Sequence, residues 1–252
     1  MRVPAIATLE FTNYCNFHCV YCWRFYEEGR RKLGFVKKEL IELMIERKEF
    51  ENTIYIEFHQ NGEATMHPQF SELIKLIKMA VPYVGLSSNG TFVNFRNNAI
   101  EGIRLLDHLT LSIHSETKQE DIIKVLELLE GSKTKVRIQT IGGQTYNIDF
   151  DQFKKYKNVF FDNNPLRERN TEYGEPKFCL DLSASVTVQW DGDVVPCCNV
   201  VGKQKVLGNL YKEPLEVIWE RHDKKIFDYC KTCLAPSPYL HRLNFFVKGM
   251  EL

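Results

Sequence analysis

The sequence predicts an α/β protein, in which a partial (β/α)6 barrel is followed by a small domain of one β-hairpin and one helix. Short β-branched runs alternate with longer amphipathic stretches, which is the pattern of repeated βα units. Six such strands are too few for a closed eight-stranded barrel, although a doubly wound sheet has the same local pattern. After Asp162 the alternation stops, which indicates a second domain.

Local patterning places each element of the expected barrel. The strands are expected at Ala5–Glu10, Thr53–His59, Tyr83–Ser88, His108–His114, Lys135–Ile141 and Asn158–Asp162. The helices between them are expected at Lys38–Lys48, Gln69–Met79, Asn94–Leu106, Gln119–Leu129 and, with a weaker pattern, Asp149–Tyr156.

The alternation of side chains along the strands favours the partial barrel over the doubly wound sheet. On the second strand Ile54, Ile56 and Phe58 share a face that would pack on helices. The opposite face is polar on several strands, with Thr8, Glu10, Tyr55, Glu57, His59, Thr110, Ser112, His114, Arg137 and Gln139. A doubly wound sheet buries both faces and needs continuous apolar strands. We therefore expect these strands to line a wet cavity, with some of the polar residues at solvated strand ends.

The C-terminal third has a different pattern. Residues 165–178 are polar and non-periodic, as in a linker, and a strand pair at 185–190 and 194–195 flanks the turn Asp191-Gly192. A helical stretch, Leu215–Tyr229, then leads into Cys230-Lys-Thr-Cys233. We expect domains at residues 1–164 and 165–252.

Composition excludes several classes of protein. Lys plus Arg and Asp plus Glu both total 33, so the chain lacks the basic excess of a nucleic-acid-binding protein. Charges interrupt every apolar run before it reaches membrane-spanning length, and the N-terminus is acidic too soon for a secretory signal. We expect a soluble, cytoplasmic protein. Its eight cysteines fall into two groups, which favours metal ligation over disulfides.

The first cysteine group, Cys15, Cys19 and Cys22, directly follows the first expected strand. Three thiolates on one loop can hold three corners of a cubane cluster and leave one iron open, and an open metal position is typical of a catalytic site. Structural zinc is the alternative, but it prefers four ligands, and His18 lies inside the motif where its reach is poor.

This C-x3-C-x2-C motif, with Tyr21 before its last cysteine, resembles the signature of the radical S-adenosylmethionine (SAM) superfamily. The resemblance implies a [4Fe–4S] cluster whose open iron binds SAM. Cleavage of the bound SAM would give a 5′-deoxyadenosyl radical that abstracts a substrate hydrogen. The cofactor supplies the difficult chemistry, while the protein positions it and excludes water.

Further segments match the same superfamily and imply contacts with SAM. Asn61-Gly62-Glu63-Ala64 stands where the family often has Gly-Gly-Glu-Pro, which meets the methionine amino group; the first Gly and the Pro are replaced here. Ser88-Asn89-Gly90 resembles the family's turn after the third strand. The remaining expected SAM contacts are Ser112 and His114 on the fourth strand and Gln139 and Ile141 on the fifth.

The second cysteine group resembles the SPASM/Twitch domain of the superfamily, whose hairpin ends in Pro-Cys. The resemblance implies an auxiliary [4Fe–4S] cluster held by Cys179, Cys197, Cys230 and Cys233, with Cys198 spare. Four cysteines ending in C-x2-C are also a credible structural zinc site, so zinc stays an alternative here.

The layout is similar to short Twitch-type dehydrogenases, so we expect oxidation of a small polar molecule, with the auxiliary cluster accepting an electron. Substrate-facing candidates are Glu57, His59, Arg137 and Arg167, since arginine suits a carboxylate or phosphate; buried ion pairs would also explain them. The resemblance also implies an external one-electron donor such as flavodoxin or ferredoxin. The alternatives are modification of a peptide or protein and, third, a non-enzymic zinc or electron-transfer module.

Overall fold

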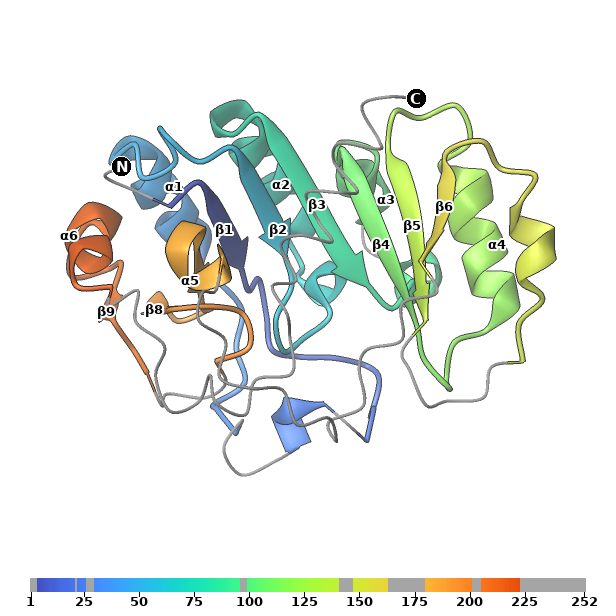
Figure 1. Ribbon diagram of the computed structural model, residues 1–252, viewed down its shortest axis with the longest axis horizontal. Coiled ribbons are helices and arrows are strands. Elements are labelled where there is room, and N and C mark those ends of the chain that lie inside the picture. The colour runs from blue at the N-terminus through green and yellow to red at the C-terminus, as the bar shows by residue number, and fades with distance from the viewer. Residues whose placement is uncertain are drawn as a thin grey trace.

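The computed structural model describes residues 4–20, 22–25, 30–95, 99–140, 147–162, 180–200 and 205–222. They form a sheet of nine strands in the order β6-β5-β4-β3-β2-β1-β7-β8-β9 (Figure 1). Several sequence predictions lie outside the described residues: the linker at 165–178, Tyr21, Ile141, Arg167, Cys179, Cys230 and Cys233.

The barrel part of the sheet is parallel. Its strands are β1 (Ile6–Leu9), β2 (Tyr55–Phe58), β3 (Tyr83–Ser88), β4 (His108–Ile113), β5 (Lys135–Thr140) and β6 (Val159–Asp162). Each pairs in parallel with its neighbours in sequence. All six expected strands are therefore present, and the predicted partial barrel is confirmed.

The C-terminal region adds the hairpin that the sequence predicts. Strand β7 (Ser185–Val188) turns back into β8 (Asp193–Val195), which pairs with β9 (Gly208–Asn209). Gly192 in the turn has a φ of 84°, a conformation that glycine adopts without strain. Strand β7 also pairs in parallel with β1, so the hairpin continues the barrel sheet.

Helices cover the outer face of the sheet (Figure 1). The α-helices are α1 (Lys38–Glu46), α2 (Phe70–Ala80), α3 (Ala99–Ile103), α4 (Gln119–Leu128), α5 (Leu180–Ala184) and α6 (Leu215–Glu220). Short 3-10 helices are η1 (Trp23–Phe25), η3 (Ala64–Met66), η4 (Thr91–Asn94) and η5 (Phe150–Phe153). Leu73, Ile74 and Ile77 of α2 form one apolar stripe that is fully buried against the strands. Among the described helices, none combines the length and apolarity needed to span a bilayer.

Three local expectations were wrong. Ile54 is 57% exposed because β2 begins only at Tyr55, so the alternation of the strand does not govern it. The helix expected over Asn94–Leu106 is divided in the described residues into η4, which ends at Asn94, and α3, which begins at Ala99. The stretch Asp149–Tyr156 forms the short 3-10 helix η5, capped by the side chain of Asp149, rather than an α-helix.

The inner face of the barrel is polar, as predicted, but it is tightly packed where the strands begin. The Tyr55 hydroxyl lies 3.0 Å from His108 Nδ1, and His108 Nε2 lies 2.9 Å from the Thr110 hydroxyl. Gly85 lies between them on β3, where an added Cβ would collide with the Tyr55 hydroxyl and the His108 ring. This hydrogen-bonded group packs the inner face where β2 and β4 begin, at the end opposite the cysteine loop.

Candidate active site

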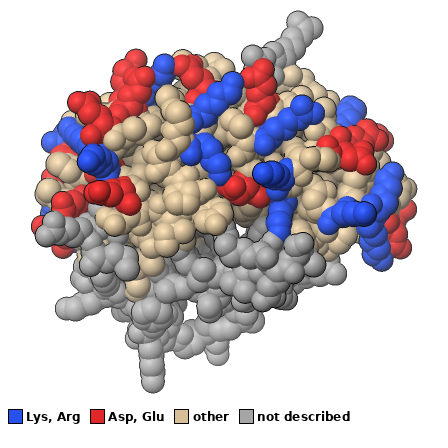
Figure 2. All heavy atoms as spheres, turned by 90° about the horizontal axis from the view of Figure 1, so that it is seen from above, with Lys and Arg blue, Asp and Glu red and all other residues tan. Residues whose placement is uncertain are grey.

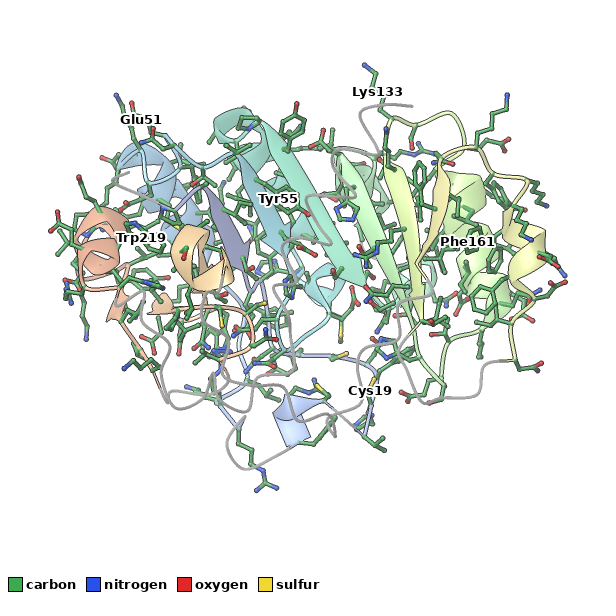
Figure 3. All side chains as sticks on the ribbon, viewed as in Figure 1. Cys19, Glu51, Tyr55, Lys133, Phe161 and Trp219 are labelled. Carbon is green, nitrogen blue, oxygen red and sulfur yellow. The ribbon has the colours of Figure 1, made fainter. Side chains whose placement is uncertain are left out.

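The loop with the first three cysteines lies beyond the carboxyl ends of the parallel strands, where Figure 3 labels Cys19. Cys15, Cys19 and Cys22 are not in disulfide bonds and have intermediate exposure. The Cys22 N–H donates to the Cys19 carbonyl at 2.9 Å, which closes a turn between these two thiols. The carboxyl ends of strands are where α/β folds of this kind place their chemistry.

Arg24, in η1, holds this loop in shape. Its guanidinium donates to the carbonyls of Asn13, Cys15 and Phe17 at 3.2, 3.3 and 3.2 Å. These carbonyls have no strand partner in an irregular loop, so a planar group with five donors is well suited to satisfy them. Arg24 was not among the site residues predicted from the sequence. The available signal was a cation two residues after the last cysteine of the motif.

The segment of residues 32–35 supports the start of the cysteine loop. Thr12 forms an antiparallel bridge with Phe35, and the Asn13 side chain bonds both the N–H of Gly34 and the carbonyl of Lys32, each at 2.9 Å. The cysteine loop is therefore tied at its start to the segment that leads into α1.

A buried ion pair lies under this segment. The Arg31 guanidinium pairs with the Glu10 carboxylate, and both side chains are almost inaccessible. The Trp190 N–H, two residues after β7, donates to the same carboxylate at 3.3 Å. Burial raises the pKa of Glu10 to about 7 against the lowering effect of Arg31. Glu10 thus joins the cysteine loop to the C-terminal hairpin.

The turn after β2 contacts the cysteine loop through its backbone. The Glu63 N–H donates to the Tyr14 carbonyl at 2.8 Å. A Cβ at position 62 would collide with the backbone of Thr12, Asn13 and Tyr14, so only glycine permits this approach. The structure thus gives a physical reason for Gly62, which the sequence predicted from its motif.

Glu63 connects the β2 turn to the β3 turn. Its carboxylate accepts the Thr65 hydroxyl at 2.6 Å, the Thr65 N–H at 3.3 Å, the Ser88 hydroxyl at 2.9 Å and the Asn89 N–H at 2.9 Å. Burial raises the pKa of Glu63, and these four donors oppose that effect. In this structure Glu63 and Ser88 position the turn.

Asn89 continues this connection to the cysteines. Its side-chain amide donates to Asn16 Oδ1 at 2.9 Å and lies 3.9 Å from Cys15 Sγ, and its Oδ1 accepts the Thr91 hydroxyl at 2.7 Å. Gly90 follows with a φ of 81°, which permits the tight turn. Two predicted residues 74 positions apart, Cys15 and Asn89, are thus brought together.

The end of β4 supplies a third wall. His114 Nδ1 lies 3.3 Å from Cys19 Sγ, and its ring packs edge-on against Phe17. Burial lowers the pKa of His114 to about 4, so the imidazole is neutral near pH 7. Ser112 lies two residues before it and is paired with Gln139 of β5, so both predicted residues are on the inner face at this end.

The donor set fits an iron–sulfur cluster. Burial, and then the charge of Glu63, raise the pKa of the Cys15 thiol to about 12, so ligation by a cation is what would make it a thiolate. Cys15, Cys19 and Cys22 lie on one loop, and three thiolates can hold three corners of a cubane because each of them binds a different iron. Asn61 Nδ2 is buried and has no hydrogen-bond acceptor among the described residues. The carboxylate of a bound ligand would supply one.

Three of the four predicted substrate-facing residues, Glu57, His59 and Arg137, are described, and they lie on the same inner face. Glu57 is 2% exposed and accepts the Ser87 hydroxyl at 2.6 Å, while His59 Nε2 lies 4.0 Å from its other oxygen. Arg137 is 8% exposed and is paired with Thr110 across the β4–β5 ladder.

One residue of the second cysteine group can be placed. Cys197 is 8% exposed and packs with Val195 and Val200, whereas its neighbour Cys198 has intermediate exposure. The inward position of Cys197 is the one expected for a ligand. The other three expected ligands lie outside the described residues, so the ligand set stays a prediction.

Two family models match the chain. A model described as the radical SAM superfamily matches residues 9–156, and a model described as an iron–sulfur cluster-binding domain, SPASM, matches residues 179–234. The first implies a [4Fe–4S] cluster that binds SAM, and the second an auxiliary iron–sulfur cluster. A curated relative, the tungsten-containing aldehyde ferredoxin oxidoreductase cofactor-modifying protein of Pyrococcus furiosus, is 29% identical over 86 residues. That match covers 34% of this chain and about a quarter (24%) of the relative.

Solved structures share the fold. BtrN in complex with AdoMet and 2-DOIA superposes with a TM-score of 0.65 and 17% identity, over 93% of this chain and 94% of that one. Streptococcus suis SuiB bound to precursor peptide SuiA gives a TM-score of 0.62 and 13% identity, over 94% of this chain and 69% of that one. At these identities the likeness concerns the fold alone.

Proposed function

The chain belongs to the radical SAM superfamily, and from that membership we propose that it oxidises a small polar substrate by hydrogen abstraction, with the auxiliary cluster accepting an electron. The observation that carries the proposal is the convergence of four segments at one end of the barrel. Asn89 lies beside Cys15, His114 lies beside Cys19, and the β2 turn bonds Tyr14.

The residues of this site would have distinct roles. Cys15, Cys19 and Cys22 would hold the cluster, which would supply the one electron needed for reductive cleavage of SAM. The Asn61 amide would donate to the SAM carboxylate, while Glu63 fixes the turn around it. The further SAM contacts proposed from the motifs are Tyr21, Gly62, Ser88, Asn89, Ser112, His114, Gln139 and Ile141.

Oxidation also requires a proton acceptor and a binding site for the substrate. Glu57 and His59, with Oε2 and Nε2 4.0 Å apart, are the titratable groups proposed to receive the proton that the substrate loses. Arg137 on β5 would bind an anionic or strongly polar group. Arg167 is proposed to do the same.

The auxiliary cluster would be held by Cys179, Cys197, Cys230 and Cys233, in a domain at 165–252 that follows a SAM domain at 1–164. A cluster with four protein thiolates has no open iron, so it would transfer electrons rather than bind substrate. We place the protein in the cytoplasm, where free thiols persist.

The experiment uses anaerobic holoenzyme, dithionite, SAM and a panel of polyols, amino sugars and hydroxy acids. We expect 5′-deoxyadenosine and an oxidised product in equal amounts, with both lost in Cys19→Ala. In Glu57→Gln, SAM cleavage should persist while product formation falls at least tenfold. Cleavage of SAM without any oxidised product across the panel would refute the oxidation, and failure to cleave SAM would refute the wider proposal.

Modification of a peptide is the second candidate, favoured by the fold shared with SuiB bound to precursor peptide SuiA. Mass spectrometry of candidate peptides after the same incubation distinguishes the two. A mass change in a peptide, with the small-molecule panel unaltered, would favour this second reaction.

A further inference from the structure

A buried group of polar side chains lies on the inner face of the sheet, where β1 and β7 run side by side. Thr187 of β7 is paired with Thr8 of β1, and Glu10 follows two residues after Thr8, so Thr187 and Glu10 lie on the same face. Arg31 reaches this face from the segment after the cysteines, where it pairs with Glu10. The Arg31 side chain is 2% exposed and the Glu10 side chain 0%, so bulk water reaches neither.

Four atoms of this group have no hydrogen-bond partner among the described residues: Glu10 Oε1, Arg31 Nε, Arg31 Nη1 and Thr187 Oγ1. Arg31 Nη2 and the Trp190 N–H both donate to the other carboxylate oxygen, Glu10 Oε2. On the face shown in Figure 2, by contrast, basic and acidic side chains are interspersed at the surface, where water can pair with them. Buried polar atoms are nearly always hydrogen-bonded, and an unpaired one is costly, so these four atoms indicate a ligand.

The charges around these atoms select the kind of ligand. Glu10 neutralises Arg31, and Asp191 is a further carboxylate close enough to raise the pKa of Glu10. A carboxylate or phosphate placed here would be repelled by Glu10, and an ammonium group could not accept a hydrogen bond from Arg31. An uncharged hydroxyl suits both partners, because it accepts from Arg31 while it donates to Glu10. The Thr187 hydroxyl can pair with a second hydroxyl of the same molecule.

We infer that Glu10, Arg31 and Thr187 bind the substrate, and that the substrate is an uncharged polyol held through two of its hydroxyl groups. The inference rests on the proposed function, for which it selects neutral polyols over hydroxy acids and sugar phosphates. Neighbouring strands lie about 4.8 Å apart and residues two apart on a strand about 6.7 Å, a separation that a polyol of five or six carbons can span. The Asn61 N–H is close enough to Glu10 to lower its pKa, so the bound polyol would lie beside the turn proposed to hold SAM.

The test measures ligand preference separately from turnover. Anaerobic holoenzyme with SAM is dialysed to equilibrium against neutral hexitols and cyclitols, and against the aldonic acids and sugar phosphates that match them in carbon number. The pH is 8, above the Glu10 pKa of about 7, so the ion pair is charged. Glu10→Gln removes the negative charge, and Thr187→Val replaces the hydroxyl with a methyl group. Glu49→Gln is the matched control, because Glu49 is also buried and accepts a backbone N–H, that of Leu215 in α6, at 2.9 Å.

We expect the parent to bind at least one neutral polyol about tenfold or more tightly than the matching acid or phosphate. Glu10→Gln should weaken polyol binding about tenfold and strengthen binding of the acids, because the Arg31 charge is then uncompensated. Thr187→Val should weaken polyol binding about fivefold without favouring the acids. Glu49→Gln should bind like the parent.

Iron content is measured in every variant, and if Glu10→Gln loses iron, the preference of the parent and the effect of Thr187→Val decide. A parent that prefers the acids or phosphates, or binds no member of the panel, would overturn the inference. Equal responses of Glu10→Gln and Glu49→Gln, both with parental iron content, would overturn it too. Binding of a polyol without its oxidation would refute the proposed reaction and leave the inference standing, whereas oxidation of an acid alone would do the reverse.

Discussion

Replacing Glu63 with glutamine tests whether one carboxylate holds the β2 and β3 turns together. The amide oxygen is best placed at the Oε1 position, where three donors meet. The amide NH2 group then faces the Asn89 N–H, which donates to Oε2 at 2.9 Å in the parent. A charge-assisted hydrogen bond is lost and two buried donors oppose each other, which costs about 1.5–3 kcal/mol.

The effect is measurable as a change in melting temperature. For a chain of 252 residues, that loss corresponds to a decrease in Tm of roughly 3–12 °C. Anaerobic calorimetry of the holoprotein measures it, with iron content as a second measurement because Asn89 lies beside Cys15. We expect less iron to be retained at a given chelator concentration.

Glu101→Gln is the matched control. Glu101 bonds Lys75 at 3.1 Å on the surface, and its side chain is 60% exposed, so the same chemical change should alter the free energy of unfolding by about 0–1 kcal/mol. Equal Tm values for the two variants, within about 1 °C, would refute the assignment of Glu63 as the connection between the turns.

Two further changes test the support of the cysteine loop. In Gly62→Ala the new methyl group meets the backbone of Thr12 and Tyr14, so we expect purified protein to hold less than half the parental iron, and normal iron content would contradict the close approach. In Glu10→Gln the pH dependence of Tm should change, because the pKa of Glu10 is raised to about 7 in the fold from an ordinary value of 4.5. Stability is lost as the buried carboxyl ionises, and glutamine does not titrate, so the Tm of the parent minus that of the variant should fall as pH rises from about 5 to 7.5; a constant difference would contradict the raised pKa.

Sequence patterning predicted the barrel because each βα unit carries its own periodicity. The register and the burial at element ends depend on where pairing begins, and this is why the alternation failed at Ile54. Gly62 and Asn89 were predicted from motifs, but the contacts that require them are tertiary. Gly62 faces the backbone of residues 12–14, and Asn89 forms a hydrogen bond with Asn16.

Other contacts of the site carried no local pattern. His114 reaches Cys19 across 95 positions only because β4 ends beside the cysteine loop. Arg24 looks like one charge among many in a stretch rich in both signs, and its role is visible only when the loop carbonyls converge on it. Contacts of this kind follow from strand order, which periodicity does not encode.

The pairing of β1 with β7 has a consequence for biosynthesis. Residues 6–9 leave the ribosome early, but their second neighbour, residues 185–188, is made only after most of the barrel. Until then the backbone N–H and C=O groups along that side of β1 are unpaired, which is the arrangement that recruits foreign strands. A nascent chain that stalls before Ser185 therefore exposes an unpaired edge of β1 next to the cysteine loop. Completion of the hairpin protects this edge by pairing β7 with it.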